Sequence, residues 1–111
     1  MIAMDMNHEI LATFYAEEGV TAKSVCKITD NATAGPCVSG DGFHGFVTTV
    51  RGGYAGVVLH GMVTVPYSGT APAVGKTALG ADGKGGVTAG GPESRLVVSV
   101  DETAKTVTMF L

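Results

Sequence analysis

The chain has 111 residues and a formal net charge of −3, and only 15% of its residues are charged. Its seven lysines and arginines are scattered singly, so the clustered positive charge that tracks a nucleic-acid backbone is missing and nucleic-acid binding is not expected. No apolar stretch approaches the length of about 18 residues that spans a bilayer. The N-terminus lacks the basic and apolar regions of a secretory signal, so neither a membrane span nor secretion is expected.

The first half of the chain combines an irregular N-terminus with short β-branched runs. Residues 1–9 contain three methionines and no period, which predicts a flexible or partner-docked arm ahead of a single domain over residues 10–111. The strands expected in this half are 9–16, 20–28, 37–38 and 43–50, with a turn over 29–36. Residues 9–16 also fit one helical turn, because two glutamates follow Ala16.

The second half continues with alternating runs and glycine-rich turns. The longest expected strand runs from Tyr54 to Val65, and Pro66 is expected to end it because proline donates no backbone hydrogen bond. Further strands are expected at 74–81 and 87–89 around a hairpin turn at 82–86, and at 95–100 and 105–111 around a turn at 101–104. No internal repeat is visible. The pattern predicts an all-β fold, a small single-domain β-barrel or sandwich of short antiparallel strands with Gly-rich turns.

The cleanest alternations predict the core. One face of 54–65 and one face of the closing hairpin are apolar, and the residues of these faces that we expect to be buried are Leu59, Val63, Val98 and Val107. Leu96 and Val100 are expected to share the face of Val98.

No residue pattern predicts catalysis. Gly75-Lys76-Thr77 lacks the upstream glycine and the following helix of a phosphate-binding loop. His44 and His60 are expected on strands, as structural or interface residues, because the spacing supplies no third metal ligand and requires no carboxylate beside them. We therefore expect a protein that is not an enzyme, with no catalytic residues, no metal ligands and no cofactor.

Cys26 and Cys37 are the only cysteines. A structural zinc site needs four ligands in short paired spacings, which two cysteines do not supply. Two reduced thiols in or near the core are expected, and a disulfide that closes a hairpin is the alternative.

The weak charge of the chain indicates that part of its surface is covered by a partner. One face of the predicted 54–65 strand is mixed rather than charged, so we expect this face to be covered too. The residues on it that we predict to contact another subunit or a capsid are His60, Met62 and Thr64. A homo-oligomer is expected.

Four segments carry a family resemblance. Segment 12–22 starts the pattern, and it is followed by the long strand region 41–67, the glycine-rich segment 73–87 and the terminal strands 97–111. In this order and spacing the chain resembles the small β-barrel capsid-decoration (cement, head-fibre-type) proteins of tailed bacteriophages and prophages. Residues 92–98 depart from that pattern.

The resemblance implies a structural protein that binds and stabilises a phage or prophage head, with the major capsid protein lattice as its partner and a trimer as the favoured oligomer. It implies a location on the virion surface, or in the bacterial cytoplasm when the protein is expressed from a prophage. The family has no catalytic residues to carry over.

The alternative is a small-ligand or glycan-binding β module without catalytic activity, or an accessory domain of an enzyme. The rim of a binding site would come from the loops 39–42, 66–72 and 82–92. A cleft that exposes Tyr15, Tyr54 or Tyr67 would favour this interpretation.

Overall fold

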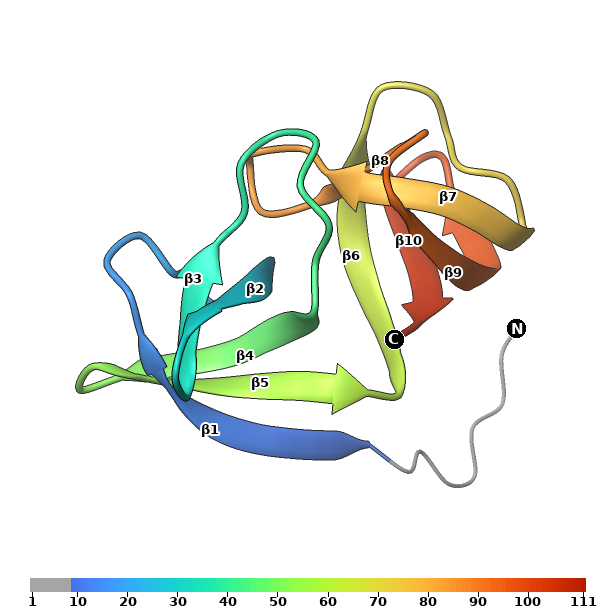
Figure 1. Cartoon of the computed structure of the whole chain (residues 1–111). Helices are drawn as coiled ribbons and strands as arrows, with labels where there is room; N and C mark the ends of the chain where they lie inside the picture. Colours follow the sequence, from blue (N-terminus) through green and yellow to red (C-terminus); the bar gives the residue numbers. More distant parts are fainter. Residues whose placement is uncertain (1–8) are drawn as a thin grey trace.

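The computed structural model describes residues 9–111, which form ten strands and no helix (Figure 1). The predicted all-β class is confirmed. The predicted arm, 1–9, lies outside the described residues except for Glu9. The strands are β1 (Ile10–Ala16), β2 (Ser24–Asp30), β3 (Thr33–Pro36), β4 (Gly45–Arg51), β5 (Tyr54–His60), β6 (Met62–Ser68), β7 (Gly75–Ala81), β8 (Val87–Ala89), β9 (Glu93–Asp101) and β10 (Thr106–Phe110).

The ten strands form two small closed barrels of identical topology. The first has the order β1-β3-β2-β4-β5 and the second the order β10-β6-β8-β7-β9. In each barrel the first and third strands pair in parallel, and all other neighbours are antiparallel. The second half of the chain therefore repeats the architecture of the first, and the prediction of no internal repeat is wrong at the level of structure.

The repeat extends to a β-bulge at the same place in each half. In the first barrel the register between β4 and β5 shifts around Thr48. In the second barrel the consecutive β10 residues Thr108 and Met109 pair with Ser99 and Val97 of β9, so Val98 is the extra residue. A bulge inserts one residue into one strand, so it reverses the alternation of side chains beyond it.

The bulge explains an error in the predicted face of the closing hairpin. Val97 is buried and Leu96 is exposed, whereas the regular alternation predicted Leu96 on the inner face. Val98 is only half-buried, so its prediction as a core residue is wrong. Val100 packs against the core as expected.

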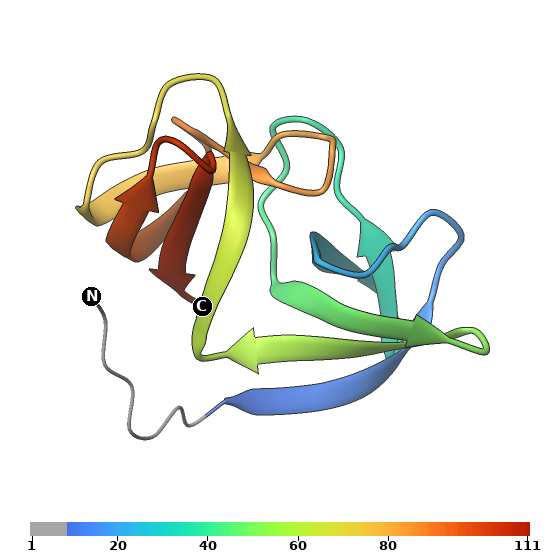
Figure 2. The same cartoon turned by 180° about the vertical axis from the view of Figure 1, so that it is seen from behind.

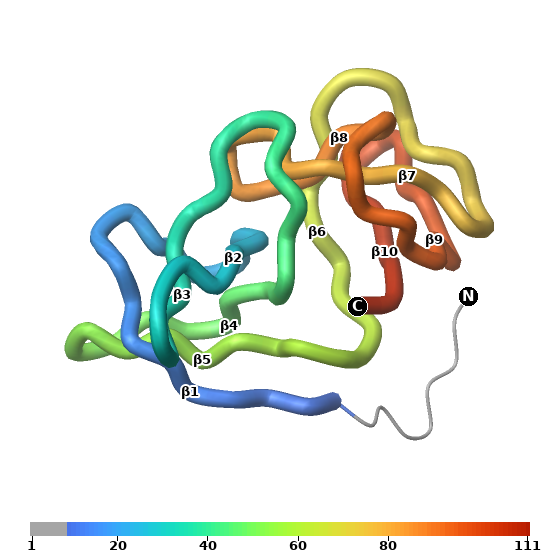
Figure 3. The backbone as a smooth tube through the Cα atoms, viewed as in Figure 1, coloured from blue at the N-terminus to red at the C-terminus, as the bar shows by residue number. Residues whose placement is uncertain are grey.

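The predicted strand from 54 to 65 is divided at Gly61, where the chain leaves the first barrel for the second. Gly61 has a φ of 131°, a conformation that L side chains rarely adopt, and its buried carbonyl accepts a hydrogen bond from the Leu111 N–H at 2.9 Å. Figure 3 shows the backbone turning at this point. Pro66 does not end the strand, because Tyr67 N–H donates to the Lys105 carbonyl and β6 continues to Ser68.

The first half contains three further differences from the predicted elements. The strand predicted at 20–28 is β2 (Ser24–Asp30), so residues 20–23 lie outside it, and residues 29 and 30, predicted as turn, lie within it. Residues 33–36, predicted as turn, form β3, which lies between β1 and β2 in the first barrel. Residues 37 and 38, predicted as a strand, lie in the loop that joins β3 to β4. The predicted hairpin turn at 82–86 is confirmed, since β7 and β8 pair antiparallel on either side of it.

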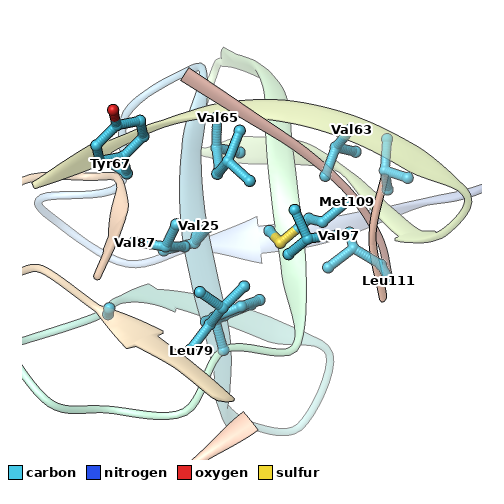
Figure 4. Packing of buried hydrophobic residues seen from close by; sticks show 13 residues of the cluster. Val25, Val63, Val65, Tyr67, Leu79, Val87, Val97, Met109 and Leu111 are labelled. Carbon is cyan, nitrogen blue, oxygen red and sulfur yellow. The ribbon is translucent and has the colours of Figure 1, made fainter. Parts of the chain in front are cut away.

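The core has two parts that meet between the barrels. The first barrel encloses a small cluster around Val47, Ala55 and Val57, and Leu59 is only half-buried against it, so its predicted burial is wrong. The second barrel encloses the larger cluster, which includes Val63 and Val107 as predicted. This larger cluster is drawn in Figure 4.

The larger cluster is completed by residues of the first barrel. Val25, Phe43 and Val58 belong to the first half of the chain, yet they are buried in the cluster of the second barrel. The backbone also crosses between the halves, since Val25 N–H donates to the Gly85 carbonyl at 2.9 Å and Ala81 N–H to the Asp41 carbonyl at 2.8 Å. The two barrels therefore share one continuous interface.

Candidate functional site

The three residues predicted to contact a partner lie around the bend at Gly61. His60 ends β5 and is exposed, Met62 begins β6 and is half-buried, and Thr64 is exposed. Met62 and Thr64 face outward, because the intervening Val63 points into the barrel. His60 belongs to the other barrel and pairs with Ile10. In Figures 1 and 2 the C-terminus lies close to this bend.

Met62 is one member of an apolar row on the outside of the second barrel. Met62 lies directly opposite Phe110 on β10. Val97 is the partner of Met109, so the adjacent residues Leu96 and Phe110 both turn outward beside each other. Leu96 is 42% and Phe110 38% exposed. We call Met62, Phe110 and Leu96 the outer row.

The surroundings of the outer row are weakly charged. The next row on the same face consists of Thr64, Thr108 and Ser99, and the hydroxyl oxygens of the two threonines are 2.8 Å apart. Lys76, the partner of Leu96 on β7, is the charged residue at the end of the outer row. The sequence predicted Met62 and Thr64 here but not Phe110 or Leu96. The alternation of 105–111 could have placed Phe110 on this face, whereas the bulge concealed Leu96.

A second exposed feature lies at the opposite end of β1 and β5. Tyr15 and Tyr54 are directly opposite each other, with ring centroids 5.5 Å apart and an angle of 32° between the rings. Both are more than half exposed. Arg51 is the partner of Tyr54 on β4 and borders an open depression of about 540 Å³ that is also lined by Ala22 and residues 48–50. Tyr67, the third predicted tyrosine, is buried in the core.

The two cysteines are in the unreactive thiol form. Burial raises the pKa of Cys26 to about 12 and that of Cys37 to about 11, so both groups remain thiols at neutral pH, and both are free in the structure. Thiolates are the reactive and metal-binding form. The arrangement therefore favours packing over nucleophilic chemistry.

The charged groups near the cysteines serve the fold. Lys27 Nζ lies 2.6 Å from Asp41 Oδ2. This hydrogen bond raises the pKa of Lys27 and, together with the Val38 N–H, lowers the pKa of Asp41. Asp41 therefore does not orient His44, whose Nδ1 instead accepts a hydrogen bond from the Ile28 N–H at 2.9 Å.

The carboxylate of Asp82 is likewise engaged in hydrogen bonds within the fold. It accepts hydrogen bonds from the N–H groups of Lys84 and Gly86 and from the hydroxyl of Ser68. These bonds define the turn between β7 and β8, the hairpin that also contacts Val25. The loop is a structural turn that joins the two barrels.

Comparison with known protein families, curated sequences and solved structures finds no match to this chain. Within residues 9–111, no group of three histidine, cysteine, aspartate or glutamate side chains is arranged to hold a metal ion. The same residues contain no helix long and apolar enough to cross a membrane.

Proposed function

We propose that the protein is a structural assembly protein that decorates a phage or prophage head by binding the lattice of its major capsid protein. The observation that supports this proposal best is the number of large apolar side chains on the surface of residues 9–111. Ten of them are at least 37% exposed, at positions 10, 11, 15, 28, 38, 50, 54, 74, 96 and 110. Leu96 and Phe110 of this set lie beside each other in the outer row, and such a row on a chain with a charged content of 15% suits a protein that works while covered by a partner.

The mechanism of the proposed function is mass action. A protein that binds only the assembled lattice stabilises it by its binding free energy. Many copies on one head each add a contact, and oligomers with several contacts gain avidity without strong single sites. Such a function needs exposed surface and a rigid scaffold, and the two barrels with their shared interface provide both.

The proposal is tested with phage heads assembled from a major capsid protein and lacking this protein. After mixing, the protein should sediment with the heads, saturate at a fixed ratio to the capsid protein, and raise the temperature at which the heads open. Unassembled capsid subunits serve as the control and should bind more weakly. Absence of binding at saturating concentration, with no change in the opening temperature, would contradict the proposal.

The adjacent rings of Tyr15 and Tyr54 support a second candidate, a glycan-binding module. Tyr15 and Tyr54 present a two-ring aromatic surface, and Arg51 beside them adds hydrogen-bond donors next to an open depression. Aromatic faces with a few convergent polar groups are common in small-molecule sites. Binding to soluble oligosaccharides, measured by calorimetry and abolished by Tyr54→Ala but not by Phe110→Ala, would favour this candidate over capsid decoration.

A further inference from the structure

The internal repeat provides a reference for the outer row. The pair next to the bulge is Val57–Val47 in the first barrel and Met109–Val97 in the second, so these two pairs correspond. Phe110 follows Met109 on β10 and Val58 follows Val57 on β5, so Phe110 corresponds to Val58. By the same count, Leu96 corresponds to Phe46, and Met62, opposite Phe110, corresponds to Leu11, opposite Val58.

The corresponding row of the first barrel is continuous, and three of its four members are covered, whereas Leu11 at its end is 53% exposed. Leu11, Val58, Phe46 and Val25 follow one another across the four strands β1, β5, β4 and β2. Val58 and Val25 are each only 2% exposed. Phe46 is partly buried and packs against the same cluster. This row is the surface with which the first barrel packs against the second.

The outer row occupies the same place on the second barrel but has no barrel against it. Its three residues are apolar like their counterparts in the first barrel, and Lys76, beside Leu96 at one end, takes the place of the apolar Val25. Leu96 and Phe110 stay more than a third exposed. The one chain thus contains two versions of the same docking surface, of which one is covered by the neighbouring barrel at three of four positions and the other is open.

We propose that a second copy of this chain covers the outer row. The inference rests on the proposed assembly function and names the subunit contact within it. A barrel of the same topology is the partner that the corresponding row of the first barrel packs against inside the chain, and a second copy brings two such barrels. The uncharged row of Thr64, Thr108 and Ser99 alongside adds no repulsion between identical chains. Closed association of identical subunits is the usual way in which soluble proteins cover such a surface.

The test is sedimentation velocity of the full chain over a concentration series, without heads. The wild type should associate as its concentration rises. Phe110→Lys and Leu96→Lys should each raise the dissociation constant by about tenfold or more, because association would desolvate an unpaired charge. Val74→Lys introduces the same charge at a loop residue that is 66% exposed and should leave association unchanged.

A second measurement keeps the inference testable if a lysine variant folds poorly. Leu96→Cys places a small thiol in the outer row, and its rate of labelling by a bulky maleimide should fall as protein concentration rises. Val74→Cys is the matched control, and its labelling rate should not depend on concentration. The native thiols add little background, because burial raises the pKa of Cys26 to about 12 and that of Cys37 to about 11.

The outcomes separate this inference from the capsid proposal. A wild type that stays monomeric at every concentration would overturn the inference, as would association that both lysine variants leave intact or Leu96→Cys labelling that is independent of concentration. Association through the outer row without binding to heads would uphold the inference and remove the capsid proposal. Head binding by a strictly monomeric chain would uphold the capsid proposal and overturn the inference that a second copy covers the outer row.

Discussion

Phe43 tests whether the two barrels form one cooperative unit. It lies in the loop between β3 and β4 of the first half, yet it is fully buried in the core cluster of the second barrel. The guanidinium of Arg95 stands 5.3 Å from the centre of its ring, and Arg95 Nη2 donates a hydrogen bond to the Phe43 carbonyl at 3.1 Å. Replacing this side chain therefore perturbs a contact that belongs to both halves.

Truncation of a buried phenylalanine costs about 3–5 kcal/mol, since apolar burial is lost and a cavity remains. We expect Phe43→Ala to lower the free energy of unfolding by this amount, a large share of the roughly 5–15 kcal/mol typical of a domain. Phe43→Leu keeps much of the volume but loses the ring contact with Arg95, so it should cost about 1–2 kcal/mol. Val38→Ala, in the same loop at a residue 63% exposed, is the control and should change stability by less than about 0.5 kcal/mol.

The assay is urea unfolding followed by circular dichroism and by tyrosine fluorescence. The two probes should give one coincident transition for the wild type and for each variant, because the barrels share their core. A loss below about 1 kcal/mol for Phe43→Ala would refute the packing argument. Two separate transitions, of which the variant lowers only one, would refute the single cooperative unit.

Three further predictions address packing, thiol chemistry and pH. A Cβ at Gly91 would stand 2.2 Å from backbone atoms of Gly80, so Gly91→Ala should cost about 1–3 kcal/mol or more in urea unfolding, and an unchanged midpoint would contradict this close approach. Burial raises the pKa of Cys26 to about 12, so iodoacetamide should label Cys26 at neutral pH only after unfolding, as mass spectrometry can follow; rapid labelling of the native protein would contradict this. The hydrogen bond from Lys27 lowers the pKa of Asp41 in the folded protein. The ionised Asp41 therefore stabilises the fold at neutral pH, and this contribution is lost as the pH falls below about 4 and through the lowered pKa. Asp41→Asn should therefore unfold with a slightly weaker acid dependence, and superimposable acid curves would argue against a contribution from this partly exposed pair.

The sequence predicted the class of fold because strand signals are local. Alternation and glycine-rich turns are properties of neighbouring residues, so most strands and the 82–86 hairpin were identified from them. Gly61 was not recognised as a break, because a single glycine within an alternating run is also compatible with a continuous strand. The bulge at Val98 was missed for a related reason, since the extra residue lies within an unbroken apolar run and nothing in its composition marks the change of face.

The internal repeat was invisible in the sequence because the two halves share burial rather than identity. Corresponding core positions can hold different apolar residues, as with Val57 and Met109. Apolar packing tolerates such exchanges when the volume is filled elsewhere. The equivalence appears only from strand pairing, and with it the outer row. Of the predicted contact residues, Met62 belongs to this row because its alternation was undisturbed, whereas His60 lies across the bend.

The most direct test of the account is a cryo-electron microscopy reconstruction of heads saturated with the protein, compared with the same heads without it. The account predicts additional density on the outside of the shell in which each copy appears as two small barrels, with the outer row of Met62, Phe110 and Leu96 covered by a neighbouring copy. Heads that carry no additional density at saturation would contradict the proposed function.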